Sequence, residues 1–106
     1  MKHELCKLSD MPAQGSIVLP FFGREVHVWR SAEGAPRAAA NVCMHFGGPL
    51  ECRDGAFVCP WHGARYDMET GARTDGPAPR DARMMFLSTR VEGEGALYVK
   101  LNGDRI

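Results

Sequence analysis

The sequence has no long hydrophobic run and no excess of charge of one sign. No segment approaches the roughly 20 apolar residues that a membrane-spanning helix needs. The first fifteen residues also contain no apolar stretch suited to a signal peptide. The 13 basic and 13 acidic residues cancel, so the basic excess typical of nucleic-acid-binding proteins is missing. We therefore expect a cytoplasmic protein that binds neither membranes nor nucleic acid.

An extended helical pattern is also missing, because 12 glycines and 7 prolines interrupt the 106 residues. Apolar and polar residues instead alternate in short segments, as in Glu25–Arg30, where Val26 and Val28 share one face. The segments that we expect to be extended are 16–19, 25–30, 37–42, 56–59, 86–91 and 96–101. This pattern predicts a single all-β domain with a small antiparallel β-sandwich as its base.

Residues 41–79 differ from the rest, since they hold six of the 12 glycines and four of the 7 prolines. We interpret them as a loop-rich subdomain inserted into a β base formed by residues 1–40 and 80–106. Within this insert, Asp54-Gly55 is a signature of a type I′ hairpin turn. Such a turn would place Cys52 opposite Phe57 and Leu50 opposite Cys59.

The insert also carries two short pairs of metal-binding residues, Cys43-x-His45 and Cys59-x-x-His62, separated by 13 residues. We call them the first arm and the second arm. Two thiols and two imidazoles are compatible with ordinary structural residues, with a structural zinc site, or with a [2Fe–2S] cluster that has two histidine ligands. Cys6 and Cys52 have no neighbouring histidine, and we expect them to be free thiols.

The residues around the arms decide among these alternatives. The runs CMHFGGPL (43–50) and CPWHGARYDMETGARTDGPAP (59–79) resemble the Rieske iron–sulfur family. The resemblance implies the Rieske fold and one [2Fe–2S] cluster, with Cys43 and Cys59 on one iron and His45 and His62 on the other. The two arms lie closer together in the sequence than is usual in the family, and the Asp54-Gly55 turn accounts for the shorter connection.

The resemblance also assigns positions around the cluster to Gly48, Trp61, Gly63, Ala64, Tyr66, Pro77 and Pro79. Gly48 and Trp61 stand where high-potential members carry two further cysteines, and Ala64 stands where they carry a hydroxyl donor. Tyr66 remains as one donor toward a cysteine sulfur. Gly63 serves backbone geometry, and Pro77 and Pro79 belong to a loop that covers the cluster.

The charge of the site follows from its ligands. Two ferric ions, two sulfides and two thiolates sum to zero, so reduction adds an electron to a neutral centre. This is why histidine ligands raise the potential of a [2Fe–2S] cluster above that of all-cysteine clusters. With the hydroxyl donor and the extra cysteines missing, we predict a low potential of about −150 to 0 mV.

The function that the resemblance implies is electron transport by a Rieske ferredoxin. Such a protein carries electrons from an NAD(P)H-dependent flavoprotein reductase to a terminal aromatic-ring oxygenase through transient contacts. The chain itself is not expected to be an enzyme, because only His3 and His27 remain for a second metal site. The alternatives are a Rieske-like small subunit of an assimilatory nitrite reductase and a zinc-stabilised interaction module. Arg65, Arg73 and Arg80 are candidates for selecting a partner, but we interpret them as solvated surface charges.

Overall fold

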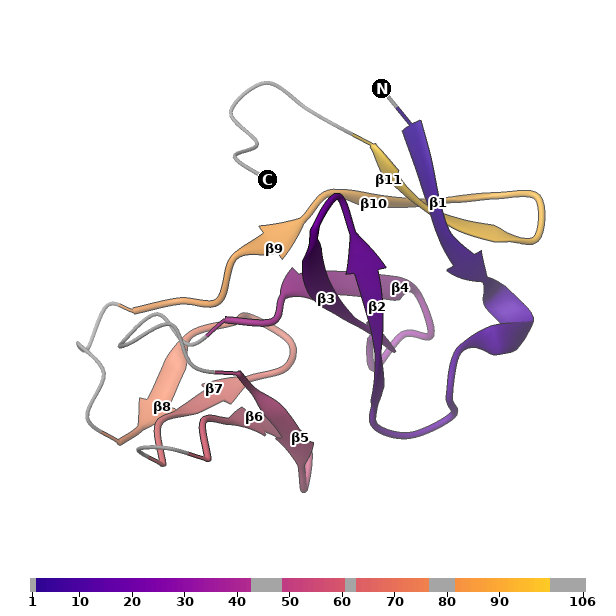
Figure 1. Cartoon of the computed structure of the whole chain (residues 1–106). Coiled ribbons are helices and arrows are strands. Elements are labelled where there is room, and N and C mark those ends of the chain that lie inside the picture. The colour runs from indigo at the N-terminus through magenta and orange to yellow at the C-terminus, as the bar shows by residue number, and fades with distance from the viewer. Residues whose placement is uncertain (1, 43–48, 61–62, 77–81, 100–106) are drawn as a thin grey trace. The chain divides into compact units, whose positions relative to one another are not determined.

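The computed structural model describes residues 2–42, 49–60, 63–76 and 82–99. The chain divides into two compact units: residues 1–40 with 86–106, which we call the base unit, and residues 41–85, which we call the arm unit. In the described residues all regular structure is strand except one short 3-10 turn, Leu8–Asp10, and every strand pairing is antiparallel (Figure 1). The predicted all-β class is confirmed.

Two antiparallel sheets make up the base unit. The three-stranded sheet has the order β1-β11-β10, and its strands are β1 (Lys2–Lys7), β11 (Gly95–Val99) and β10 (Thr89–Glu92). The four-stranded sheet has the order β2-β3-β4-β9, and its strands are β2 (Ser16–Phe21), β3 (Arg24–Arg30), β4 (Pro36–Ala40) and β9 (Phe86–Leu87).

The core of the base unit is built on the alternation in β3. Val26 and Val28 are both 0% exposed and lie in one cluster with Phe21, Ala38, Leu87 and Ala96. Ala96 comes from β11, so residues of both sheets contribute to the same core. Burying one valine side chain contributes about 1.5–3 kcal/mol, which explains why this segment forms a strand. The opposite face of β3 is buried as well, since Trp29 is 0% exposed and lies edge-on to Phe86.

Strand β3 also buries His27, whose Nδ1 lies 2.8 Å from the Ser16 hydroxyl on β2. The alternation in the sequence predicts that His27 lies on the same face of β3 as Trp29, and in the structure both side chains on this face are buried. His27 is thus a structural residue of the base unit.

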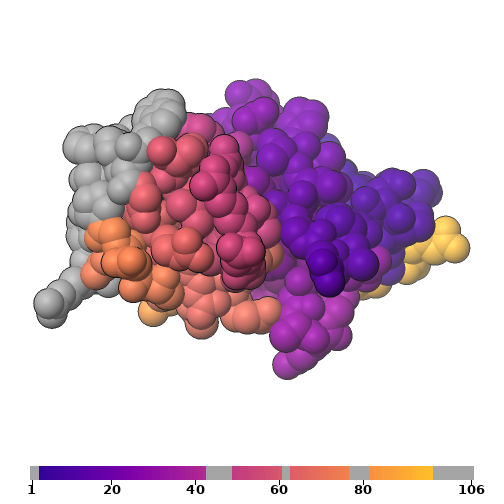
Figure 2. Space-filling model, turned by 90° about the horizontal axis from the view of Figure 1, so that it is seen from below, coloured from indigo at the N-terminus to yellow at the C-terminus, as the bar shows by residue number. Residues whose placement is uncertain are grey.

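The arm unit contains four short strands in a meander of order β5-β6-β7-β8. The strands are β5 (Glu51–Arg53), β6 (Ala56–Val58), β7 (Arg65–Asp67) and β8 (Arg73–Asp75). Figure 2 shows the described residues of this unit, coloured from magenta to orange, as closely packed atoms. No helix in the described ranges has the length and apolar character needed to cross a membrane.

The hairpin between β5 and β6 has the predicted turn. Asp54 and Gly55 have φ values of 48° and 79°, both positive as a type I′ turn requires. The predicted pairing of Cys52 with Phe57 is confirmed, and the recorded register begins with Glu51 opposite Val58. The expected pairing of Leu50 with Cys59 lies one residue beyond that register.

Candidate metal centre

The second arm begins where the β6·β7 ladder ends. Val58 pairs with Arg65, and beyond this pair the Cys59 N–H donates to the Ala64 carbonyl at 2.9 Å. The Gly63 N–H then donates back to the Cys59 carbonyl at 2.7 Å. Two backbone bonds therefore close the loop that carries the Cys59-x-x-His62 sequence. Cys59 is 0% exposed, so it is shielded from water at the point where this loop begins.

The segment that follows β8 packs directly on this loop. A Cβ atom on Gly76 would lie 2.5 Å from the Ala64 Cα, 2.8 Å from the Ala64 N and 2.8 Å from the Gly63 carbonyl oxygen. All three are backbone atoms, so the conflict cannot be relieved by a side-chain rotation. Gly76 also has a φ of 92°, which disfavours any residue with a side chain. Gly76 is thereby packed tightly against the backbone of Gly63 and Ala64.

A side chain that the sequence reasoning missed joins two residues on either side of the first arm. The Asn41 Oδ1 accepts a hydrogen bond of 2.8 Å from the Leu50 N–H. Leu50 is only 3% exposed, so this bond ties a buried backbone group across the segment that holds Cys43 and His45. An asparagine two residues before the predicted ligand Cys43 is the signal that the sequence offers, and asparagine is too common in turns for this signal to be decisive.

Two predicted neighbours of the cluster are buried in the arm unit. Ala64 and Tyr66 are both 0% exposed, and Tyr66 stands opposite Phe57 on one side and Arg73 on the other. Gly63, by contrast, is exposed and has a φ of 78°. The left-handed backbone of Gly63 agrees with the predicted geometric role. Other predicted site residues lie outside the described residues: Cys43, His45, Gly48, Trp61, His62, Pro77 and Pro79.

One interpretation from the sequence needs correction. Arg73 is half-buried, and its Nη1 donates to the Gly76 carbonyl at 2.8 Å. It is therefore not a freely solvated surface charge. Sequence reasoning missed this because the acceptor is a backbone carbonyl, which carries no residue-specific signal.

The remaining thiols differ from Cys59 in their surroundings. Cys6 is half-buried beside the base core, and this burial, followed by the charges of Asp10 and Glu4, raises the pKa of its thiol. A protonated thiol is a poor metal ligand. Cys52 lies with its Sγ 3.6 Å from the Met68 Sδ, and both Cys6 and Cys52 are free cysteines as predicted.

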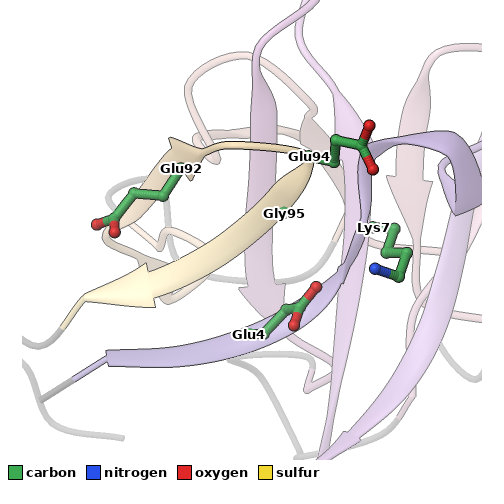
Figure 3. Close-up of a pocket in the computed structure, with 5 residues that line it drawn as sticks. All are labelled: Glu4, Lys7, Glu92, Glu94 and Gly95. Atoms are coloured by element: carbon green, nitrogen blue, oxygen red, sulfur yellow. The ribbon is translucent and has the colours of Figure 1, made fainter.

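The base unit has a pocket of a different character. It is lined by Glu4, Lys7, Glu92, Glu94 and Gly95 (Figure 3). Glu92 points away from the other charged side chains in this view, and the lining contains no thiol or imidazole. Among the residues that the structure describes, no three His, Cys, Asp or Glu side chains are grouped as metal ligands. Three of the four expected ligands lie outside that part of the chain.

Comparison with known proteins gives the family. The model of the Rieske [2Fe-2S] domain matches residues 1–91, so the chain belongs to the Rieske [2Fe-2S] domain family. A domain of this family carries one [2Fe–2S] cluster. The predicted family and cofactor are thus confirmed.

Individual relatives are similar over part or all of the chain. The oxidoreductase NdmD of Pseudomonas putida is 35% identical over 78 residues, which are 69% of this chain and 13% of the relative. The oxygenase component of chloroacetanilide N-alkylformylase from Rhizorhabdus wittichii is 38% identical over 60 residues, 54% of this chain and 17% of that protein. This chain therefore matches only a small part of the length of either curated relative.

A solved structure is similar over nearly the whole chain. The ferredoxin of Sphingomonas yanoikuyae B1 superposes with a TM-score of 0.78 at 19% identity, covering 95% of this chain and 100% of the ferredoxin. At this identity the comparison speaks for the fold, which is that of a Rieske protein.

Proposed function

We propose that this chain is a one-electron carrier whose cluster is bound by Cys43 and Cys59 on one iron and by His45 and His62 on the other. The observation that carries the proposal is the closed loop of the second arm, with its buried Cys59. A buried thiol on a loop closed by two backbone bonds fits a thiolate ligand, and no disulfide competes for it. When bound, the cluster accepts and returns one electron.

The arm unit is the part of the chain that we assign to cluster binding, with the subdomain spanning about residues 41–79 as the sequence predicts. Its described residues supply positioning and exclude water. The Gly76 contact fixes the backbone of Gly63 and Ala64 beside the second arm, and the Asn41–Leu50 bond joins the residues on either side of the first.

The potential of the carrier is proposed to lie low in the Rieske range, at about −150 to 0 mV. Support comes from Ala64, which is buried and offers no hydroxyl to the cluster. Hydrogen bonds to cluster sulfurs raise the potential, since they stabilise the added negative charge. Tyr66 is buried two residues further along and is the remaining hydroxyl that we assign to this role.

The partners that we propose are a flavoprotein reductase, which supplies electrons, and a terminal oxygenase of the aromatic-ring type, which receives them. The oxygenase assignment is supported by the curated relative that is itself an oxygenase component. The ferredoxin of the same fold supports the carrier role. Contacts are expected to be transient, as in other small redox interfaces, and the site of action is proposed to be the cytoplasm, where thiols stay reduced.

A reductive titration tests the function. The wild-type protein should take up one electron per chain and return it to an oxidant over repeated cycles without loss of the visible spectrum. Cys59→Ser should take up no electron. Cys52→Ser is the matched control, because it removes a thiol from the same unit at a residue outside the ligand set, and it should titrate like the wild type. A wild-type protein that accepts no electron refutes the proposal.

A further inference from the structure

We propose that Arg73 is a positioning residue for the cluster, which holds the Gly76 segment against the second arm and supplies that arm with a half-buried positive charge. The inference deepens the proposed function and rests on it. It starts from three features of the arm unit: the side-chain bond of Arg73, the packing of Gly76, and the backbone bonds of Cys59.

The side chain of Arg73 is directed by the sheet that carries it. In the β7·β8 ladder Arg65 pairs with Asp75 and Tyr66 pairs with Arg73, so the register shifts and Thr74 is left over as a bulge. Bulges of this kind re-aim a side chain and are frequent beside functional sites. Here the guanidinium turns back over the end of its own strand and donates to the Gly76 carbonyl at 2.8 Å.

The main chain of Arg73 is held as well. Its N–H donates to the Ala82 carbonyl at 3.0 Å, so the residue is anchored where the chain returns after the segment 77–81. One residue therefore contacts both flanks of the segment that contains Pro77 and Pro79. A second bond, from the Gly76 N–H to the Asp75 Oδ1 at 2.8 Å, fixes the same glycine from the other side.

Gly76 is linked to the proposed ligand Cys59 by two successive contacts. Gly76 lies against the backbone of Ala64, and the Ala64 carbonyl accepts the Cys59 N–H. A displacement of Gly76 would therefore move the backbone that holds the Cys59 thiol. Among the described residues, the side chain of Arg73 bonds to Gly76 and its main chain bonds to Ala82, so we infer that it acts through Gly76.

The charge of Arg73 adds an electrostatic role. Its Nε is buried and has no hydrogen-bond partner among the described residues, so water does not fully solvate this cation. A poorly solvated cation acts on its surroundings through a lower effective dielectric constant than an exposed one. Because reduction adds one negative charge to the arm unit, Arg73 should favour the reduced state.

Arg83 provides a matched control in the same unit. It is exposed, carries the same charge, and also donates from Nη1 to a backbone carbonyl, that of Thr70, at 3.4 Å. Its charge faces water and should be screened. Comparing Arg73→Gln with Arg83→Gln therefore separates the loss of this particular cation from the loss of any cation.

The experiment is a redox titration of the full chain that measures the midpoint potential of the cluster, with visible circular dichroism as the monitored signal. Arg73→Gln should lower the ratio of reduced to oxidised protein at a fixed ambient potential by about three- to tenfold, where tenfold corresponds to 59 mV for a one-electron couple. Arg83→Gln should change this ratio less than about twofold. Arg73→Lys, which keeps the charge, should recover most of the wild-type potential.

The outcomes separate the roles. If the potential of Arg73→Gln shifts no more than that of Arg83→Gln, the inference is wrong. If Arg73→Gln cannot hold the cluster while Arg73→Lys and Arg83→Gln hold it, the positioning role is supported. If Arg73→Lys loses the cluster as well while Arg83→Gln holds it, the guanidinium bond to the Gly76 carbonyl is what is needed, which also supports the positioning role. If Arg73→Lys holds the cluster but does not recover the wild-type potential, the electrostatic role is refuted. Failure of the proposed function would appear earlier, as a wild-type protein without a reducible cluster.

Discussion

Replacing Gly76 by alanine tests the packing on which the second arm depends. The added Cβ would lie 2.5 Å from the Ala64 Cα, and its three nearest neighbours are all backbone atoms. Overpacking of this kind costs about 1–3 kcal/mol. A φ of 92° adds a backbone cost, for which about 1–2 kcal/mol is typical of a left-handed residue. The expected destabilisation is the sum, about 2–5 kcal/mol, which is a large share of the stability of a small domain.

Gly34→Ala is the matched control. Gly34 has a φ of 86°, and a Cβ there would meet nothing within 4 Å. This variant should therefore lose only the stability that corresponds to the left-handed backbone, without an overpacking cost. Since about 1 kcal/mol shifts the melting temperature of a small domain by about 4–8 °C, Gly76→Ala should melt at least about 4 °C below Gly34→Ala.

The assay is thermal unfolding of both holoproteins at one scan rate. Visible absorbance monitors the cluster, and far-ultraviolet circular dichroism monitors the secondary structure. Gly76→Ala should also lose its visible absorbance before its secondary structure, because the arm is disturbed first. Equal melting temperatures for the two variants, with full cluster content in both, would show that Gly76 does not support the arm.

Two further predictions concern residues near the arms and in the base. Asn41→Leu removes the acceptor of the buried Leu50 N–H, which costs about 1–3 kcal/mol, so this variant should lose its visible absorbance faster at elevated temperature. Asn41→Asp keeps an oxygen acceptor and should resemble the wild type; equal decay of all three proteins contradicts the role of this bond. Because burial raises the pKa of Cys6, iodoacetamide at pH 8 should alkylate it more slowly in the folded protein than in urea, as mass spectrometry of its peptide can measure. The stability linked to this thiol is fully present below its unfolded pKa and is lost as the pH rises through the higher folded value. Equal alkylation rates of Cys6 in the folded and unfolded protein would contradict this prediction.

The sequence predicts the features that local interactions determine, in both units. Val26 and Val28 alternate with residues of the opposite face, as the pattern predicts, while the burial of His27 and Trp29 on that opposite face is added by the fold. Asp54 and Gly55 demand one turn type, and that turn sets the register of β5 and β6. In both cases the determining interactions are local.

Strands β1, β7 and β8 were not predicted from the sequence. Each of β7 and β8 has three residues, mostly polar, and pairs because neighbouring strands supply the partners. The same holds for Asn41 and Arg73, whose partners are backbone groups that only the fold brings near. The convergence of Cys43, His45, Cys59 and His62 on one cluster remains a prediction that rests on the motif and on the family.

That convergence is tested most directly by pulsed electron paramagnetic resonance on the reduced wild-type protein, together with its iron and sulfide content. We predict two irons and two sulfides per chain and couplings from two histidine nitrogens. His45→Ala and His62→Ala should each remove either the whole cluster or one of the two couplings. His27→Ala should leave both couplings in place. Bound zinc in a colourless protein, or a cluster without histidine couplings, would contradict the proposed ligand set.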